Sequence, residues 1–135
     1  MKFFSAAAMA EMSEDVPAAT ATLLPHWVEG PHIASRLDVG IVTMSAGGCT
    51  PQHSHDGGQV LVVTAGTGFV EVVGGERRIV TVGDMIVAQP GEIHIHGALG
   101  DGAFAHLTVT TLGYQFPAAP VDAGPVVAAP IAPSA

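Results

Sequence analysis

Short runs of β-branched and aliphatic residues, separated by glycine-containing turns, fill the chain between residues 36 and 113. Positions 59–64 are nearly all β-branched or aliphatic, and no long segment shows the periodicity of an amphipathic helix. Gly74-Gly75 is typical of a hairpin turn, and Gly83-Asp84 marks another turn. The pattern predicts strands at 37–44, 59–64, 69–73, 77–82, 85–88, 93–96 and 103–112. Short strands at this spacing indicate an all-β fold, an antiparallel sandwich or barrel.

The two ends of the chain lack this pattern. Residues 1–35 are rich in alanine and contain three prolines, so we expect an N-terminal arm with at most one helix. Residues 117–135 hold five of the ten prolines among alanine and valine, which predicts a flexible tail. That tail could alternatively wrap a partner subunit. The folded domain is therefore expected at 36–116.

Composition limits the partners of this domain. A chain of 135 residues is long enough for one buried core. Four basic against twelve acidic residues give a net charge of −8, which argues against nucleic acid or an anionic membrane as a partner. Only 12% of the residues are charged and 48% are hydrophobic. So few charges favour a homodimer or higher homo-oligomer, in which a second subunit covers apolar surface.

The compartment is expected to be the cytoplasm. Cys49 is the single cysteine, so no intrachain disulfide can form. The apolar stretch at 1–10 is short and runs into acidic residues, unlike a signal peptide, and no apolar stretch is long enough to cross a membrane. We read Cys49 as a small loop or strand residue, although a catalytic thiol or metal ligand is an alternative.

Histidines in two alternating pairs are the candidate chemistry. His53 and His55 point to one face of an extended strand, and Gln59 has the same parity. His94 and His96 repeat the spacing on a later strand. Two imidazoles on one face of an apolar barrel are costly to bury unless a partner satisfies them, and neutral imidazole is a common metal ligand. The pairs therefore predict a metal site.

Two motifs around these histidines resemble those of the cupin family. The first runs from Gly47 through His53-Ser54-His55 and Gln59 to Gly66, and the second from Gly83-Asp84 through Pro90-Gly91-Glu92-Ile93-His94. The second departs from the family at Ala98, where asparagine is usual. The resemblance implies a small single-domain cupin, an antiparallel β-barrel of the jelly-roll type. It also implies one divalent transition metal per chain, held by His53, His55, Gln59 and His94.

Gln59 stands where the cupin motif usually has an acidic residue, so this ligand set carries no negative charge. A metal ion with neutral ligands keeps its full charge toward an incoming anion, which favours Lewis-acid chemistry over oxygen activation. Because three-histidine oxygenases exist among cupins, a metal-dependent dioxygenase of a small organic substrate is the alternative. A non-catalytic ligand-binding cupin is a third possibility.

Further residues are expected to complete a pocket. His96 and His106 are candidate general acid–base groups, or they hydrogen-bond to the groups around the metal. Thr108 and Thr110 share the strand face of His106. Apolar walls are expected from Val42, Met44, Leu61, Val63 and Phe69. Such a pocket suits a small, weakly polar substrate.

Among cupins, the chain resembles the manganese-dependent hydroxynitrile lyases. The similarity lies in segments 58–66 and 90–97 and in the histidine at position 106. It implies cleavage of a cyanohydrin to an aldehyde and cyanide, or the reverse addition. It also favours manganese, although iron, zinc, nickel or cobalt fit the same donors.

Overall fold

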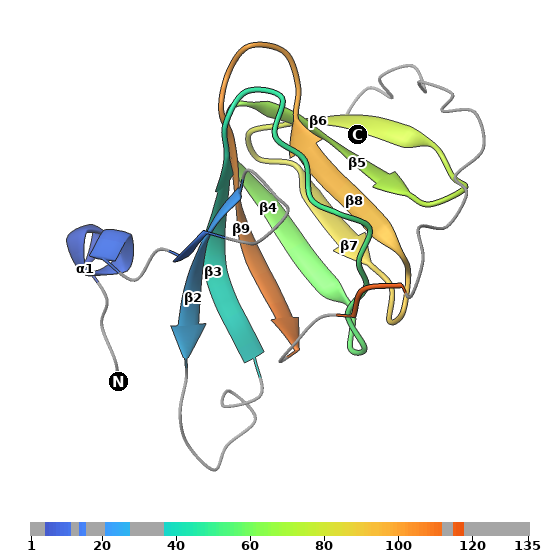
Figure 1. Ribbon diagram of the computed structural model, residues 1–135, viewed down its shortest axis with the longest axis horizontal. Helices are drawn as coiled ribbons and strands as arrows, with labels where there is room; N and C mark the ends of the chain where they lie inside the picture. Colours follow the sequence, from blue (N-terminus) through green and yellow to red (C-terminus); the bar gives the residue numbers. More distant parts are fainter. Residues whose placement is uncertain (1–4, 12–13, 16–20, 28–36, 112–114, 118–135) are drawn as a thin grey trace.

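The computed structural model describes residues 5–11, 14–15, 21–27, 37–111 and 115–117. The strands form two antiparallel sheets that face one another (Figure 1). The six-stranded sheet has the order β1-β2-β3-β9-β4-β7, and the three-stranded sheet the order β6-β5-β8. The elements are α1 (Ala6–Glu11), β1 (Glu14–Asp15), β2 (Ala21–Trp27), β3 (Leu37–Met44), β4 (Gln59–Ala65), β5 (Thr67–Val72), β6 (Arg77–Thr81), β7 (Met85–Ala88), β8 (His94–Ala98) and β9 (Phe104–Thr111).

The all-β prediction is confirmed. The predicted strands 37–44 and 85–88 coincide with β3 and β7, and the other five differ from the observed strands by two residues or fewer at each end. Every pairing between these strands is antiparallel. In the described part of the chain no helix is long and apolar enough to span a membrane.

The N-terminal segment differs from the expected arm because it adds two strands to the sheet. The one helix allowed for is α1, but β2 also pairs with β3 over seven residues, from Ala21↔Met44 to Trp27↔Asp38. Pro25 lies inside β2 and reads as a strand breaker in the sequence, since proline has no N–H for a strand partner. Tertiary context overrides that signal, because β3 offers an otherwise unpaired edge. The predicted tail, 117–135, lies outside the described residues except for Pro117.

The space between the sheets is apolar at one end and polar at the other. Val42, Met44, Val63 and Phe104 belong to the buried hydrophobic cluster. Along β9 the inward side changes from Phe104 to His106, Thr108 and Thr110, all buried. The same strands that supply the core therefore carry polar side chains into the other end of the barrel.

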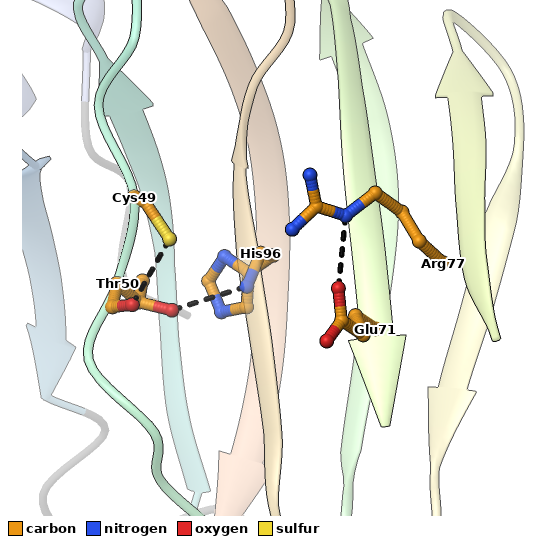
Figure 2. Close-up of polar contacts among 5 residues, drawn as sticks. All are labelled: Cys49, Thr50, Glu71, Arg77 and His96. Carbon is orange, nitrogen blue, oxygen red and sulfur yellow. Dashed lines mark hydrogen bonds and ion pairs between the residues drawn. The ribbon is translucent and has the colours of Figure 1, made fainter. Parts of the chain in front are cut away.

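An irregular extended segment, residues 48–54, joins the three-stranded sheet beside β8. The N–H of Thr50 donates to the carbonyl of His96 (2.9 Å), and the N–H of His96 donates to the Thr50 hydroxyl (3.1 Å; Figure 2). His53 and His94 exchange backbone hydrogen bonds of 3.1 and 2.9 Å. The two motifs, far apart in sequence, are thus held side by side.

Gly68 shows how tightly the apolar end is packed. A Cβ atom at this position on β5 would lie 2.6 Å from the ring of Phe104, whose exposed fraction is 1%. Gly102, in the turn before β9, has open space around its would-be Cβ. Packing alone therefore requires glycine at 68 and not at 102.

We expect Gly68→Ala to lower the free energy of unfolding by about 1–3 kcal/mol, because the ring of Phe104 must move. The matched variant Gly102→Ala should stay within about 0.5 kcal/mol of wild type. Urea unfolding followed by circular dichroism measures both. Equal stability of the two variants would contradict the packing described.

Candidate metal centre

Six polar side chains from four parts of the chain converge at the polar end of the barrel. His53 and His55 come from segment 48–55, Gln59 from β4, and His106 from β9. His94 and His96 come from β8. None of the six is more than 7% exposed, so each has lost most of its contact with water. Such burial of imidazoles is stable only where their nitrogens have partners.

His53, His94 and His96 form the tightest group. One ring nitrogen from each lies within 4.8 Å of the other two. Nδ1 of His53 contacts the carbonyl of Pro51 at 2.9 Å, and a carbonyl oxygen can only accept. Nδ1 of His53 therefore carries the proton, which leaves the lone pair on Nε2. A backbone carbonyl that fixes the tautomer in this way is typical of a metal-ligating histidine.

His94 provides the test of whether a cation fits. Its Nδ1 faces the carbonyl of Glu92 at 2.8 Å, and its Nε2 faces Oε1 of Gln59 at 2.9 Å. Burial lowers the pKa of His94, which favours the neutral ring with a single N–H. One of the two contacts therefore joins two lone pairs. A metal ion beside Nε2 and Oε1 would accept both lone pairs, so these residues fit a cation.

The orientation of Gln59 follows from β9. Its amide Nε2 donates to the hydroxyl of Thr108 at 2.8 Å, which directs Oε1 toward His94. Thr110, two residues further on, donates instead to the carbonyl of Gly58 at 3.1 Å. Both threonines lie on the inner face, but only Thr108 touches the amide.

His96 differs from the other two histidines of the group. Its Nδ1 lies 3.1 Å from Nε2 of His106, so its partner is a second imidazole rather than a carbonyl. Its Nε2 is buried and has no hydrogen-bond partner among the described residues. After the contact between His94 and Gln59, this buried nitrogen without a partner is a second sign that the site fits a metal ion or another ligand.

Burial dominates the electrostatics of the cluster. Loss of hydration, with a smaller contribution from neighbouring His94, lowers the pKa of His53 to about 4. Burial also lowers the pKa of His106 to about 4 and that of His96 well below its usual value. Near pH 7 these rings are neutral, which is the protonation state that binds a metal.

The structure brings all four predicted ligands together. The ring of His55 lies 5.2 Å from that of His53 and 5.7 Å from that of His94, measured between centroids. The structure also places His96 in the converging group, although the sequence predicts an acid–base role for this residue. Because side chains alternate along a strand, the sequence predicted that His96 faces the same cavity as His94. Its distance from His53 depends on the pairing of segment 48–54 with β8, which the sequence does not reveal.

The carbonyls of Pro51 and Glu92 are site groups that sequence reasoning missed. Each accepts from the histidine two residues later. Every residue has a carbonyl, so no side-chain pattern marks these two.

Four of the five predicted wall residues face the inside of the barrel, and Phe69 does not. Val42, Met44, Leu61 and Val63 are buried on the inner side of the six-stranded sheet. Phe69 pairs with Gly97, whereas Val70 pairs with His96, so Phe69 lies on the opposite face of the sheet from His96. Gly66, just before β5, and Gly68, within it, hide the strand's parity in the sequence.

On that outer face Phe69 contributes to a separate polar arrangement. The guanidinium of Arg77 lies 3.9 Å above its ring, and Nε of Arg77 pairs with the buried carboxylate of Glu71 at 2.8 Å (Figure 2). This carboxylate is on the other side of the sheet from the histidines. Among the described residues, the three whose ligand atoms lie within 4.8 Å of one another are all histidines.

Comparison with known proteins agrees with the fold. The profile of the Cupin domain matches residues 40–110, which is more than half of the chain. The chain therefore belongs to the cupin family.

Individual relatives come from several bacteria. The chain is 41% identical over 68 residues to an (R)-mandelonitrile lyase from Granulicella tundricola, a match covering 50% of this chain and 52% of that protein. The match thus spans about half of the length of that relative. The structure resembles a cupin-like protein from Thermotoga maritima (TM-score 0.65, 29% identity, 71% and 74% of the two chains). It also resembles the polyketide cyclase RemF from Streptomyces resistomycificus (TM-score 0.69, 23% identity, 84% and 81%).

We expect the metal-free protein to lose stability as the pH falls from 6.5 to about 4. The pKa of His53 and of His106 is about 4 in the folded protein, against 6.5 for the unperturbed group. In this window the unfolded chain binds protons that the folded chain does not, so acid favours unfolding. Each group adds up to about 1.4 kcal/mol per pH unit. The loss is absent above pH 6.5.

Urea unfolding in the presence of a chelator, repeated at several pH values, measures this slope. His106→Gln removes one titrating group and should make the slope shallower. A slope of zero across the window, or one that His106→Gln leaves unchanged, would contradict the buried neutral state.

Thr108→Val should weaken metal binding by roughly 10–100-fold, because Gln59 loses the partner that directs its oxygen toward His94. Thr110→Val is the matched control, an identical change two residues away that leaves the Gln59 amide untouched. Competition with a fluorescent chelator gives both affinities. If the two variants bind metal equally well, Thr108 has no part in the site.

Proposed function

We propose that this cupin is a metal-dependent lyase that breaks or forms the bond between carbon and cyanide in a small cyanohydrin. The observation that carries the proposal is the hydrogen-bonded pair His96–His106 beside a cluster of neutral donors. The pair can move a proton, and the donors fit a Lewis-acidic ion. Both are needed where negative charge develops while a proton is transferred.

The partners of the histidines separate two roles. His53 and His94 each contact a backbone carbonyl through Nδ1, which suits a fixed ligand. His96 contacts an imidazole, so the proton between them can belong to either ring. We infer that His53, His55, Gln59 and His94 hold the metal, and that His96 exchanges a proton with the substrate through Nε2.

The metal would supply electrostatic stabilisation of negative charge on the substrate oxygen or on cyanide. His96, neutral at pH 7, takes the proton of the cyanohydrin hydroxyl, and His106 shares the resulting charge through their hydrogen bond. The oxygen's electrons form the carbonyl, and the carbon–carbon bond breaks with its electron pair on cyanide. The proton on His96 then passes to cyanide, which leaves as hydrogen cyanide. No redox change occurs.

The surroundings of the pair favour a small, weakly polar substrate. Val42, Met44 and Leu61 are buried on the same inner face. Apolar walls with few polar groups accept a short aliphatic or aromatic aldehyde rather than a sugar or a charged metabolite. The 41% identity to a mandelonitrile lyase supports the same reaction class, but over half of that protein only.

Manganese is the metal that we propose, on the resemblance of the motifs to those of manganese-dependent hydroxynitrile lyases. Neutral nitrogen and amide oxygen donors bind several divalent metals, and availability contributes to which is found. Elemental analysis of protein purified without added metal, followed by reconstitution, identifies the ion that restores activity.

The experiment follows mandelonitrile cleavage by metal-replete protein, with metal content measured on each variant. His96→Gln should retain the metal while activity falls roughly 100- to 10,000-fold, as for loss of a general base. His53→Gln should lose metal and activity together. If His96→Gln also loses the metal, His96 is a ligand and the assigned base is wrong.

Measurement of oxygen uptake distinguishes the lyase from the alternative reaction class, a dioxygenase. Three imidazoles also suit iron in an oxygenase. If the protein consumes oxygen with a small organic substrate and cleaves no cyanohydrin, it is a dioxygenase and not a lyase. Metal binding without turnover of either kind would favour a ligand-binding cupin.

A further inference from the structure

Two further segments extend the three-stranded sheet beyond β8. Segment 48–54 pairs with β8, and Gln115, in the described segment 115–117, pairs in turn with Ser54 (Figure 1). The N–H of Ser54 donates to the carbonyl of Gln115 at 2.9 Å, and the N–H of Gln115 donates to the carbonyl of Ser54 at 2.8 Å. This exchange fixes the antiparallel register of segment 115–117 against the segment that carries two of the proposed metal ligands.

The register places Phe116 opposite His53. Because Ser54 and Gln115 exchange both hydrogen bonds, the adjacent pair, His53 and Phe116, makes none between its backbones. The Cβ atoms of such a pair lie about 4.5–5.5 Å apart, and both side chains are on the same face of the sheet. His53 points into the barrel, toward His94. Phe116 therefore lies on the inner face, beside a proposed ligand.

The same cross-strand row continues past the ligands to Val72. Val72 pairs with His94, and His94 pairs with His53, so the row runs Val72, His94, His53, Phe116. The exposed fractions along it are 38%, 5%, 7% and 52%. Two buried imidazoles thus lie between two exposed apolar side chains. A molecule that approaches the imidazole nitrogens along this row meets apolar surface first.

Phe116 offers an exposed aromatic ring at the edge of the site. An aryl group can pack on such a ring by offset stacking or edge to face, which raises affinity roughly 3- to 10-fold beyond the effect of the apolar area it buries. A methyl group has no ring to stack and buries less area. Phe116 can therefore distinguish substrates by the group attached to the reacting carbon, while the metal ligands hold the polar end.

We propose that Phe116, with Val72 at the other end of the row, determines substrate specificity by favouring an aromatic substituent. This inference rests on the lyase function proposed above, since it concerns the substituent of the same substrate. Neither side chain can bind a metal or transfer a proton. Their replacement should therefore leave the metal content unchanged.

Binding of benzoate and of acetate to the metal-loaded protein tests the inference without turnover. The two anions share a carboxylate and differ in the substituent, so the ratio of their dissociation constants, measured by titration calorimetry, reports on the residues that meet the substituent. Wild type is expected to bind benzoate more tightly. Phe116→Ala should reduce this preference ~10-fold. Phe116→Leu, which keeps an apolar side chain without the ring, should reduce it less.

Val72→Ala and Val82→Ala form a matched pair. Val72→Ala should reduce the preference for benzoate roughly 3-fold, because it removes part of the apolar contact. Val82 is 62% exposed and follows β6, where Thr81 pairs with Thr67 at the other end of β5 from Val72. Val82→Ala should leave the preference unchanged. Circular dichroism and elemental analysis check that each variant is folded and holds its metal.

Cleavage of mandelonitrile and of acetone cyanohydrin by the same variants separates this inference from the proposed reaction. If no cyanohydrin is cleaved but Phe116→Ala loses the preference for benzoate, the reaction is wrong and the role of Phe116 stands. If mandelonitrile is cleaved but Phe116→Ala changes neither preference, the lyase stands and the role of Phe116 is wrong. A wild type that binds benzoate no more tightly than acetate also overturns the inference.

Discussion

The pairing of segment 48–54 with β8 is the constraint on which the rest of the site depends. Backbone hydrogen bonds join Thr50 to His96 and His53 to His94. Without them, the two histidine pairs would belong to separate parts of a barrel and their nitrogens would not converge. Backbone groups make these bonds, and one more is accepted by the Thr50 hydroxyl, so the convergence depends little on the other side chains of the segment. The chemistry is therefore positioned by strand pairing and not by side-chain packing.

Burial gives this arrangement its chemical character. The rings are removed from water, so the charged form is disfavoured and the pKa of His53 and of His106 falls to about 4. Neutral imidazoles whose Nδ1 is fixed by a carbonyl present lone pairs inward, where a metal ion would satisfy them. The same removal from water strengthens the electrostatic effect of any bound ion. Binding, orientation and reactivity thus have one physical cause.

The six-stranded sheet separates a polar inner site from an aliphatic outer face, because side chains alternate along each strand. Its inner positions on β4 and β9 hold Gln59, His106 and Thr108, which belong to the site. Its outer positions on the same strands are aliphatic, as at Val60 on β4 and Val109 on β9. A shift of one residue in register would exchange the two sets, so the register of β4 against β9 protects both at once.

The sequence by itself determined the seven strands between 37 and 111, the cupin family and the identity of the residues that meet. Short apolar runs and glycine turns carry that information locally, and the two motifs carry the rest. Tertiary structure decided what depends on pairing over long distances. It placed β2 in the sheet despite Pro25, put Phe69 outside the barrel, and brought His96 to within reach of His53 and His94. Parity along one strand predicts a face, but only the partner strand decides which atoms on that face come into contact.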